Sequence, residues 1–139
     1  MKRIGFIGMG NMGYAILKGL LQVFDREVLL LTDADRKRAE KISEETGVAC
    51  AADNAACASM ADYVVLAVKP QYYDAVLSDI KDTVTKEKII ISIAPSVTIQ
   101  DLKEKLGQDR RIVRAMPNTP ALVGMGVTGV CYEAERFSE

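Results

Sequence analysis

The segment Gly8-Met9-Gly10-Asn11-Met12-Gly13 limits the fold of this chain more than any other part of the sequence. An apolar run precedes it and a helical pattern follows it, so the G-x-G-x-x-G spacing falls between a predicted strand and a predicted helix. In a dinucleotide-binding turn, Gly8 permits the tight turn after the strand, Gly10 leaves room for pyrophosphate, and Gly13 lets the helix pack closely. The motif therefore predicts that a dinucleotide binds at the helix N-terminus, where free N–H groups carry about half a positive charge.

An acidic residue in the second strand–helix unit supports this interpretation. Asp33 follows Gly13 by 20 residues, at the end of the apolar run 28–31. A carboxylate at this spacing can accept hydrogen bonds from the ribose hydroxyls of the nucleotide. A glycine-rich loop that holds no ligand is the alternative interpretation.

Composition and charge exclude several classes of function. The chain has 139 residues, 49% of them hydrophobic, and a formal net charge of −1. These values suit one domain with a sizeable core and give no basic face for nucleic acid. Met1-Lys2-Arg3 leads directly into a predicted strand, and the apolar runs are too short to span a membrane. We therefore expect a soluble, cytoplasmic protein that binds neither nucleic acid nor a membrane.

The cysteines and the absence of histidine restrict the chemistry further. The sequence has no histidine, and Cys50, Cys57 and Cys131 form no C-x-x-C pair. No metal site is expected, and neither a Ser-His-Asp nor a Cys-His arrangement can form within the chain. The three cysteines are predicted to be small residues in or near the core.

Strand and helix patterns alternate along the chain, which predicts a doubly wound, Rossmann-type parallel α/β sheet with one strand added after the sixth. We expect Asp33 or Asp35, Asp53 or Asn54, and Thr98 to cap helices, and Gly47 and Gly107 to end two of them. The predicted strands are 3–8, 28–32, 48–50, 63–68, 88–93, 111–115 and 127–132, and the predicted helices are 11–22, 35–46, a short one from Asn54, 71–81 and 98–106, with an irregular stretch over 116–126.

Three segments, in this order and spacing, resemble pyrroline-5-carboxylate reductase. They are F-I-G-M-G-N-M-G at 6–13, Ala67-Val68-Lys69-Pro70, and R-A-M-P-N-T-P at 114–120. The resemblance covers residues 1–139 but only the family's N-terminal dinucleotide-binding domain; the C-terminal helical domain, which makes the oligomer and much of the substrate pocket, is absent. It implies reduction of 1-pyrroline-5-carboxylate to L-proline, the last step of proline biosynthesis, with NADPH or NADH and in a homo-oligomer.

The resemblance also implies site residues, position by position. The loop Gly8–Gly13 would hold the pyrophosphate, and Asn54 would contact the adenosine part of the cofactor. Asn118 would lie near the reacting end, where substrate and nicotinamide meet. Residues after two strand ends would line the cofactor: Ala67, Val68, Lys69 and Pro70 after one, and Ile93, Ala94 and Pro95 after the other.

Simpler interpretations exist for several of these residues. Asn54 suits a plain helix cap, Lys69 a solvated charge, and Asn118 a turn residue. Met9 and Met12 suit packing around the loop better than chemistry.

Two departures from the family pattern affect the cofactor. Pro95 removes one N–H and stiffens a loop that often contains glycine. Asp33 favours NAD, because it would repel a 2′-phosphate, whereas the basic run Arg36–Arg38 would offset that repulsion. We expect both cofactors to bind, with a slight preference for NADPH; an exposed helix face is the plain alternative for the basic run.

Two other functions remain open. The chain could be the cofactor domain of another two-domain reductase, such as a β-hydroxyacid dehydrogenase, or a non-catalytic dinucleotide-binding module. The segment Arg114–Pro120 favours an enzyme, because a sensor does not need this loop at the nicotinamide end. No group that could clamp the substrate carboxylate is evident, so the missing domain is expected to supply it.

Overall fold

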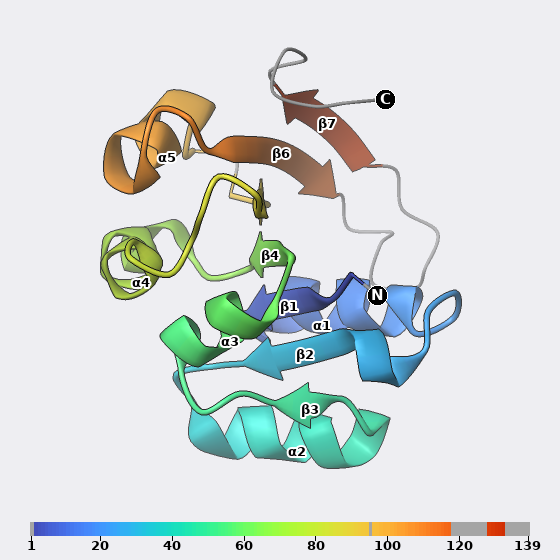
Figure 1. Cartoon of the computed structure of the whole chain (residues 1–139). Coiled ribbons are helices and arrows are strands. Elements are labelled where there is room, and N and C mark those ends of the chain that lie inside the picture. Colours follow the sequence, from blue (N-terminus) through green and yellow to red (C-terminus); the bar gives the residue numbers. More distant parts are fainter. Residues whose placement is uncertain (1, 95, 118–127, 133–139) are drawn as a thin grey trace.

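A computed structural model describes residues 2–94, 96–117 and 128–132 of the chain. Seven strands form one sheet in the order β3-β2-β1-β4-β5-β6-β7 (Figure 1). β1 to β6 are parallel, and β7 pairs antiparallel with β6. The strands are β1 (Ile4–Ile7), β2 (Leu29–Thr32), β3 (Ala49–Cys50), β4 (Tyr63–Leu66), β5 (Ile89–Ser92), β6 (Arg111–Pro117) and β7 (Thr128–Tyr132). The predicted parallel sheet with an added strand is confirmed.

The order in which strands are added to the sheet reverses at β1. β1 pairs with β2 on one side and with β4 on the other, in register from Ile4↔Leu29 and Ile4↔Tyr63. The chain therefore builds one half of the sheet outward from β1 through β2 and β3, and the other half outward through β4. In open parallel sheets, ligands bind beyond the carboxyl ends of the strands at this point.

The helices cover both faces of the sheet. They are α1 (Asn11–Leu20), α2 (Arg36–Thr46), α3 (Asn54–Met60), α4 (Tyr73–Ile80) and α5 (Ile99–Leu106), with short 3₁₀ helices η1 (Arg26–Val28) and η2 (Pro70–Tyr72). α1 and α2 pack on one face, and α3, α4 and α5 on the other (Figure 1).

Successive residues of a strand therefore enter different cores. In β1, Phe6 packs with the α1–α2 layer and Ile7 with the α3–α5 layer. In β2, Leu30 faces the layer opposite to that of Leu29 and Leu31. A strand covered on both faces needs apolar residues at every position, which explains the unbroken apolar runs of the sequence.

Helix caps follow the predicted residues in most cases. Asp35 caps α2 by accepting from the amide of Arg38, and Gly47 ends α2 at φ 76°, where glycine is favoured. Asp53, not Asn54, caps α3. Thr98 caps α5 in a capping box with Asp101.

Some boundaries differ from the predictions. β4 ends at Leu66, so residues 67 and 68 belong to the following loop. The predicted helix 71–81 begins with the 3₁₀ turn η2 and becomes α-helical at Tyr73. β6 continues to Pro117 instead of ending at 115, because β7 pairs with it as far as Pro117↔Thr128.

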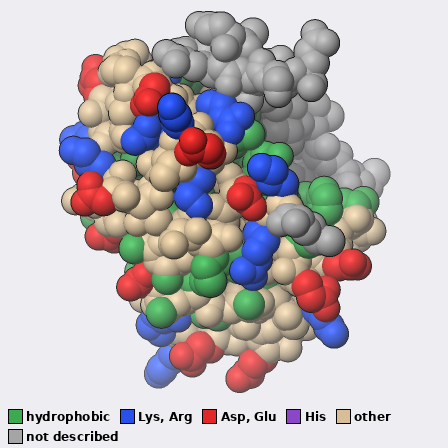
Figure 2. All heavy atoms as spheres, viewed as in Figure 1, with side chains coloured by type: hydrophobic (Ala, Val, Ile, Leu, Met, Phe, Trp, Pro, Cys, Tyr) green, Lys and Arg blue, Asp and Glu red, His purple; other side chains and the backbone are tan. Residues whose placement is uncertain are grey.

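An apolar groove with a volume of about 600 Å³ lies on the α1 side of the sheet. Its lining includes Ile16 and Leu20 of α1 and Ile91 of β5. Charged side chains of both signs are interspersed on the face that Figure 2 shows. Within the described part of the chain, no helix combines the length and apolar character that crossing a membrane requires.

Candidate functional site

The glycine-rich loop joins β1 to α1 in a tight turn. Gly8 has φ +103°, a conformation that side-chain-bearing residues rarely adopt. A Cβ at Gly8 would lie 2.8 Å from the carbonyl carbon and oxygen of Ala67. The amide of Gly8 donates to the carbonyl of Thr32 at 2.9 Å, so the turn is fixed against the end of β2.

Gly13 and Gly10 differ in what surrounds them. A Cβ at Gly13 would lie 2.5 Å from the Gly8 carbonyl oxygen, so α1 approaches the loop more closely than alanine would allow. A Cβ at Gly10 would meet nothing within 4 Å, and Gly10 is the N-cap of α1, without a side-chain cap. The N-terminus of α1 therefore opens onto free space, where its N–H groups can meet an anion.

The ends of β4 and β5 lie beside this loop. The amide of Ala67 donates to the carbonyl of Ile7 at 2.8 Å, and that of Ile93 to Leu66 at 3.3 Å. Ala94 is buried, whereas Lys69 and Pro70 are exposed. The fold thus brings residues 67–70 and 93–94 to the edge of the sheet that contains the glycine loop.

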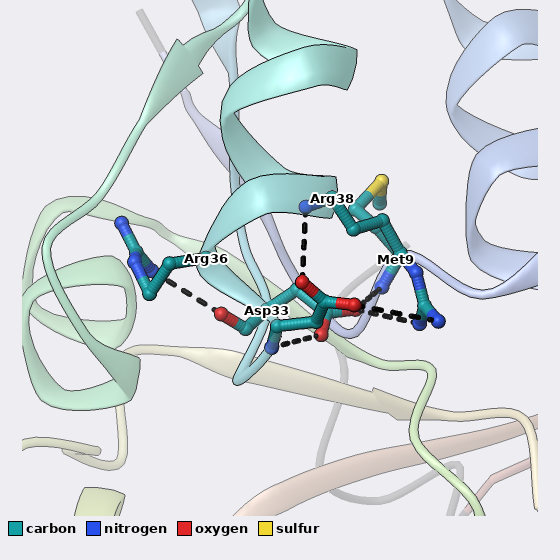
Figure 3. Close-up of polar contacts among 5 residues, drawn as sticks. Met9, Asp33, Arg36 and Arg38 are labelled. Atoms are coloured by element: carbon teal, nitrogen blue, oxygen red, sulfur yellow. Dashed lines mark hydrogen bonds and ion pairs between the residues drawn. The ribbon is translucent and has the colours of Figure 1, made fainter.

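Asp33 does not present a free carboxylate to this edge. Its Oδ2 accepts from the amide of Met9 at 2.6 Å, and its Oδ1 accepts from the amide of Asp35 at 2.8 Å. Arg38 Nη1 lies 3.5 Å from Oδ2, and the Asp33 side chain is only 10% exposed. Figure 3 shows dashed lines from this carboxylate to the Met9 amide and to Arg38. Both oxygens of Asp33 thus accept hydrogen bonds within the chain, and ribose binding by Asp33 stays a prediction.

Arg36 is engaged by the chain itself. It donates from Nη1 to Thr32 Oγ1 at 2.9 Å and from Nη2 to the carbonyl of Ala51 at 3.0 Å. It also reaches the Asp33 carbonyl at 3.2 Å, on the opposite side of Asp33 from Arg38 (Figure 3). These bonds tie the end of β2 to the residue after β3. Of the basic run, Arg36 is therefore engaged by hydrogen bonds within the chain, and Arg38 by ion pairs with Asp33 and Asp35.

Asn54 lies at the first position of α3 and not at its cap. Its Nδ2 donates to Asp79 Oδ2 of α4 at 3.1 Å. The alternative interpretation, in which Asn54 is a plain helix cap, is wrong because Asp53 accepts from the Ala56 amide in that role. Contact with adenosine remains a prediction.

The side chains of Met9 and Met12 differ in exposure. Met9 is 1% exposed and belongs to the α1–α2 core, while Met12 is half-buried and Asn11 is exposed. The side chain of Met9 is thus a packing group, and its amide is the part that faces Asp33. Asn118 and Pro95 lie outside the described residues.

A buried hydroxyl pair beneath the site was missed from the sequence. Tyr73 donates to the Leu66 carbonyl at 3.1 Å, and its oxygen lies 2.9 Å from Ser92 Oγ. Burial raises the pKa of Tyr73, against the hydrogen bond from Ser92, so the phenol stays neutral. The pair links the ends of β4 and β5. A helical spacing of apolar residues could have predicted that this tyrosine is buried: Tyr73, Val76, Leu77 and Ile80. No sequence signal predicts its contact with Ser92.

Cys50 and Cys57 agree with the predicted packing role, while the side chain of Cys131 lies outside the described part of the chain. Cys57 is fully buried and Cys50 is half-buried, and both are free thiols. Burial raises the pKa of Cys57 to about 12. Over the described ranges, no three His, Cys, Asp or Glu side chains form a group that could hold a metal ion.

A family model and relatives of known name match this chain. A family model described as NADP oxidoreductase, coenzyme F420-dependent, matches residues 3–96. The chain is 44% identical over 136 residues to the pyrroline-5-carboxylate reductase of Escherichia coli (strain K12), across 96% of this chain and 50% of that protein.

Two solved structures resemble this chain over most of its length. A pyrroline-5-carboxylate reductase from Coxiella burnetii matches with a TM-score of 0.89 and 39% identity, over 96% of this chain and 50% of that one. The Plasmodium falciparum pyrroline carboxylate reductase with NADP bound matches with a TM-score of 0.84 and 32% identity, over 96% and 48%. The chain spans about half the length of the curated relatives it matches.

Proposed function

We propose, from the premise that the chain belongs to the family described as NADP oxidoreductase, coenzyme F420-dependent, that it is the cofactor-binding part of a pyrroline-5-carboxylate reductase. That enzyme would reduce 1-pyrroline-5-carboxylate to L-proline with NADPH or NADH, in the last step of proline biosynthesis. The support is the resemblance at residues 6–13, 67–70 and 114–120, together with relatives of that name. A cytoplasmic location and a homo-oligomer of the longer protein are parts of the same proposal.

The observation on which the proposal most depends is the open side of Gly10. The free space at Gly10 lies at the uncapped N-terminus of α1. Pyrophosphate fits such a place, because backbone N–H groups and the helix dipole both favour an anion there. Residues 67–70 and 93–94 would then extend the cofactor site along the ends of β4 and β5.

The nicotinamide cofactor supplies the hydride when it is bound, and the protein supplies position and electrostatics. In this chain the α1 amides would orient the pyrophosphate, and the buried pair Tyr73–Ser92 keeps the ends of β4 and β5 together. The substrate imine is basic enough to arrive partly protonated, so the absence of histidine does not exclude the reaction. The carboxylate clamp and Asn118 belong to the proposal as predictions.

Two alternatives fit the same cofactor geometry. In one, the chain is the cofactor domain of another two-domain reductase, such as a β-hydroxyacid dehydrogenase. In the other, it is a dinucleotide-binding module without catalysis. Activity of the longer protein with pyrroline-5-carboxylate would favour the first proposal over both.

Calorimetric titration with NADPH and NADH tests the cofactor role. The Gly10→Val variant should bind at least about tenfold more weakly, because the added side chain would fill the space that pyrophosphate needs. Gly10 has φ −71° and ψ −169°, an extended conformation that valine adopts readily, so the free protein should remain folded.

Gly19→Val is the matched control. Gly19 lies in the same helix, and a Cβ there would also meet nothing within 4 Å. Its affinity should stay within about twofold of the original chain. Equal affinity of Gly10→Val and Gly19→Val for both cofactors would refute binding at the glycine loop.

A further inference from the structure

The short hydrogen bond between Met9 and Asp33 joins the glycine loop to the end of β2. The donor–acceptor distance of 2.6 Å is at the short end for an N–H···O bond to a carboxylate oxygen. The second oxygen of Asp33 accepts from the Asp35 amide at 2.8 Å. Both oxygens of Asp33 are therefore used by backbone amides of the chain.

Met9 is held by more than this bond. Its side chain is 1% exposed within the α1–α2 core, and the preceding amide, of Gly8, is bound to the Thr32 carbonyl at 2.9 Å. Two successive amides of the loop are thus fixed to two successive residues at the end of β2. The next residue is Gly10, where α1 begins.

Arg38 forms ion pairs with the carboxylates of both Asp33 and Asp35. Its guanidinium lies 3.5 Å from Asp33 Oδ2 and 3.9 Å from Asp35 Oδ2, and its side chain is 49% exposed. Arg38 therefore places a positive charge beside the Asp33 carboxylate. Each carboxylate oxygen of Asp33 thus accepts a backbone amide, and the Arg38 guanidinium forms an ion pair with the same Oδ2, so the carboxylate is already engaged within the chain.

We propose that Asp33 is a positioning residue, which holds the turn Gly8–Gly10 through the Met9 amide and so orients the N-terminus of α1 toward pyrophosphate. Asp33 does not bind the ribose hydroxyls. The inference depends on the proposed function only in requiring that the chain binds a dinucleotide.

A thermodynamic cycle separates this role from ribose recognition. The affinity of the original chain and of Asp33→Asn is measured for NADH and for NADH that lacks the 2′-hydroxyl of the adenosine ribose. A positioning role predicts that Asp33→Asn lowers the affinity for both ligands by the same factor. This factor should be about tenfold, the scale of a charge-assisted hydrogen bond. A loss confined to NADH would show a direct contact with the hydroxyl and overturn the inference.

Asp35→Asn is the matched control, because it removes the same charge two residues away. Asparagine also caps helices well, so α2 should keep its N-terminus. Its affinity for NADH should stay within about twofold of the original chain. A loss equal to that of Asp33→Asn would attribute the effect to charge alone and overturn the inference.

A second measurement needs no ligand. The amide hydrogen of Met9 should exchange slowly in the original chain, faster in Asp33→Asn, which keeps an acceptor oxygen, and fastest in Asp33→Ala. Unchanged exchange in both variants would overturn the inference. Failure of the original chain to bind any dinucleotide would instead refute the proposed function, while the exchange of Met9 would still report whether Asp33 fixes the loop.

Discussion

Single residues in this structure have functions that their chemical type alone does not reveal. Met9 contributes an apolar side chain to the core and an amide to Asp33. Cys57 has a reactive group but is fully buried beneath β1, with its Sγ 3.6 Å from the Phe6 carbonyl. The surroundings of a residue decide which of its groups make contacts. For Cys57, burial raises the pKa and so disfavours the thiolate.

The raised pKa of Cys57 makes stability depend on pH in a defined direction. Its pKa is about 12 in the folded chain and 9.0 in a model thiol. The contribution of the neutral thiol to the free energy of unfolding is therefore fully present below pH 9. It declines as the pH rises toward 12, the pKa in the folded chain. At pH 10 the loss should be about 1.4 kcal/mol. Urea unfolding of the original chain and of Cys57→Ala at pH 8 and 10 measures it.

Cys50→Ala is the control for this measurement, since Cys50 is half-buried. The free energy of unfolding should fall with pH more steeply in the original chain and in Cys50→Ala than in Cys57→Ala. Equal slopes in all three proteins would contradict the assignment to Cys57.

At the scale of elements, the site depends on how neighbouring strand ends are tied together. Tyr73 and Ser92 connect β4 with β5, and Arg36 connects β2 with the residue after β3. β3 is only two residues long, so its ladder supplies few bonds of its own. The guanidinium of Arg36 compensates for this short ladder.

Replacing Arg36 by methionine should therefore destabilise the chain. The loss of hydrogen bonds to Thr32 and Ala51 should lower the free energy of unfolding by about 1 kcal/mol, since Arg36 is exposed to solvent. Lys37→Met is the matched control, because Lys37 is exposed and adjacent on α2. Denaturant unfolding compares the two variants, and equal stability would show that Arg36 does not hold the strand ends.

The sequence predicted the parts of the fold that depend on local chemistry. The caps at Asp35 and Thr98 and the helix end at Gly47 follow from residue type and spacing. The contacts of Asp33 could not be predicted, because they join residues 24 positions apart through tertiary structure. The extension of β6 to Pro117 depends on pairing with β7, which no local pattern encodes.

At the scale of the whole molecule, the described structure combines an open N-terminus of α1 with an apolar groove on the α1 side of the sheet. The groove of about 600 Å³ lies between α1 and side chains of β4, β5 and β6, on the face opposite α3, α4 and α5. The chain also spans about half the length of its relatives, so part of the proposed active site is expected elsewhere.

The 139-residue chain should therefore bind NADPH without reducing pyrroline-5-carboxylate. Oxidation of NADPH, followed at its absorbance maximum, should stay far below about 1 turnover per second, a rate ordinary for enzymes. The full-length pyrroline-5-carboxylate reductase of Escherichia coli, assayed in parallel, is the positive control. Turnover at that rate by the 139 residues alone would contradict a site shared between two halves.

The position of β1 in the sheet has a consequence for how the chain folds. The residues of β1 are synthesised first, but one of its two partner strands, β4, begins 59 residues later, at Ile4↔Tyr63. Parallel pairings over such separations form slowly, because a long loop must close before any of their bonds are made. A ribosome-bound chain that ends before residue 63 can pair β1 only with β2. Until β4 emerges, one edge of β1 remains unpaired and available to chaperones and to other nascent chains.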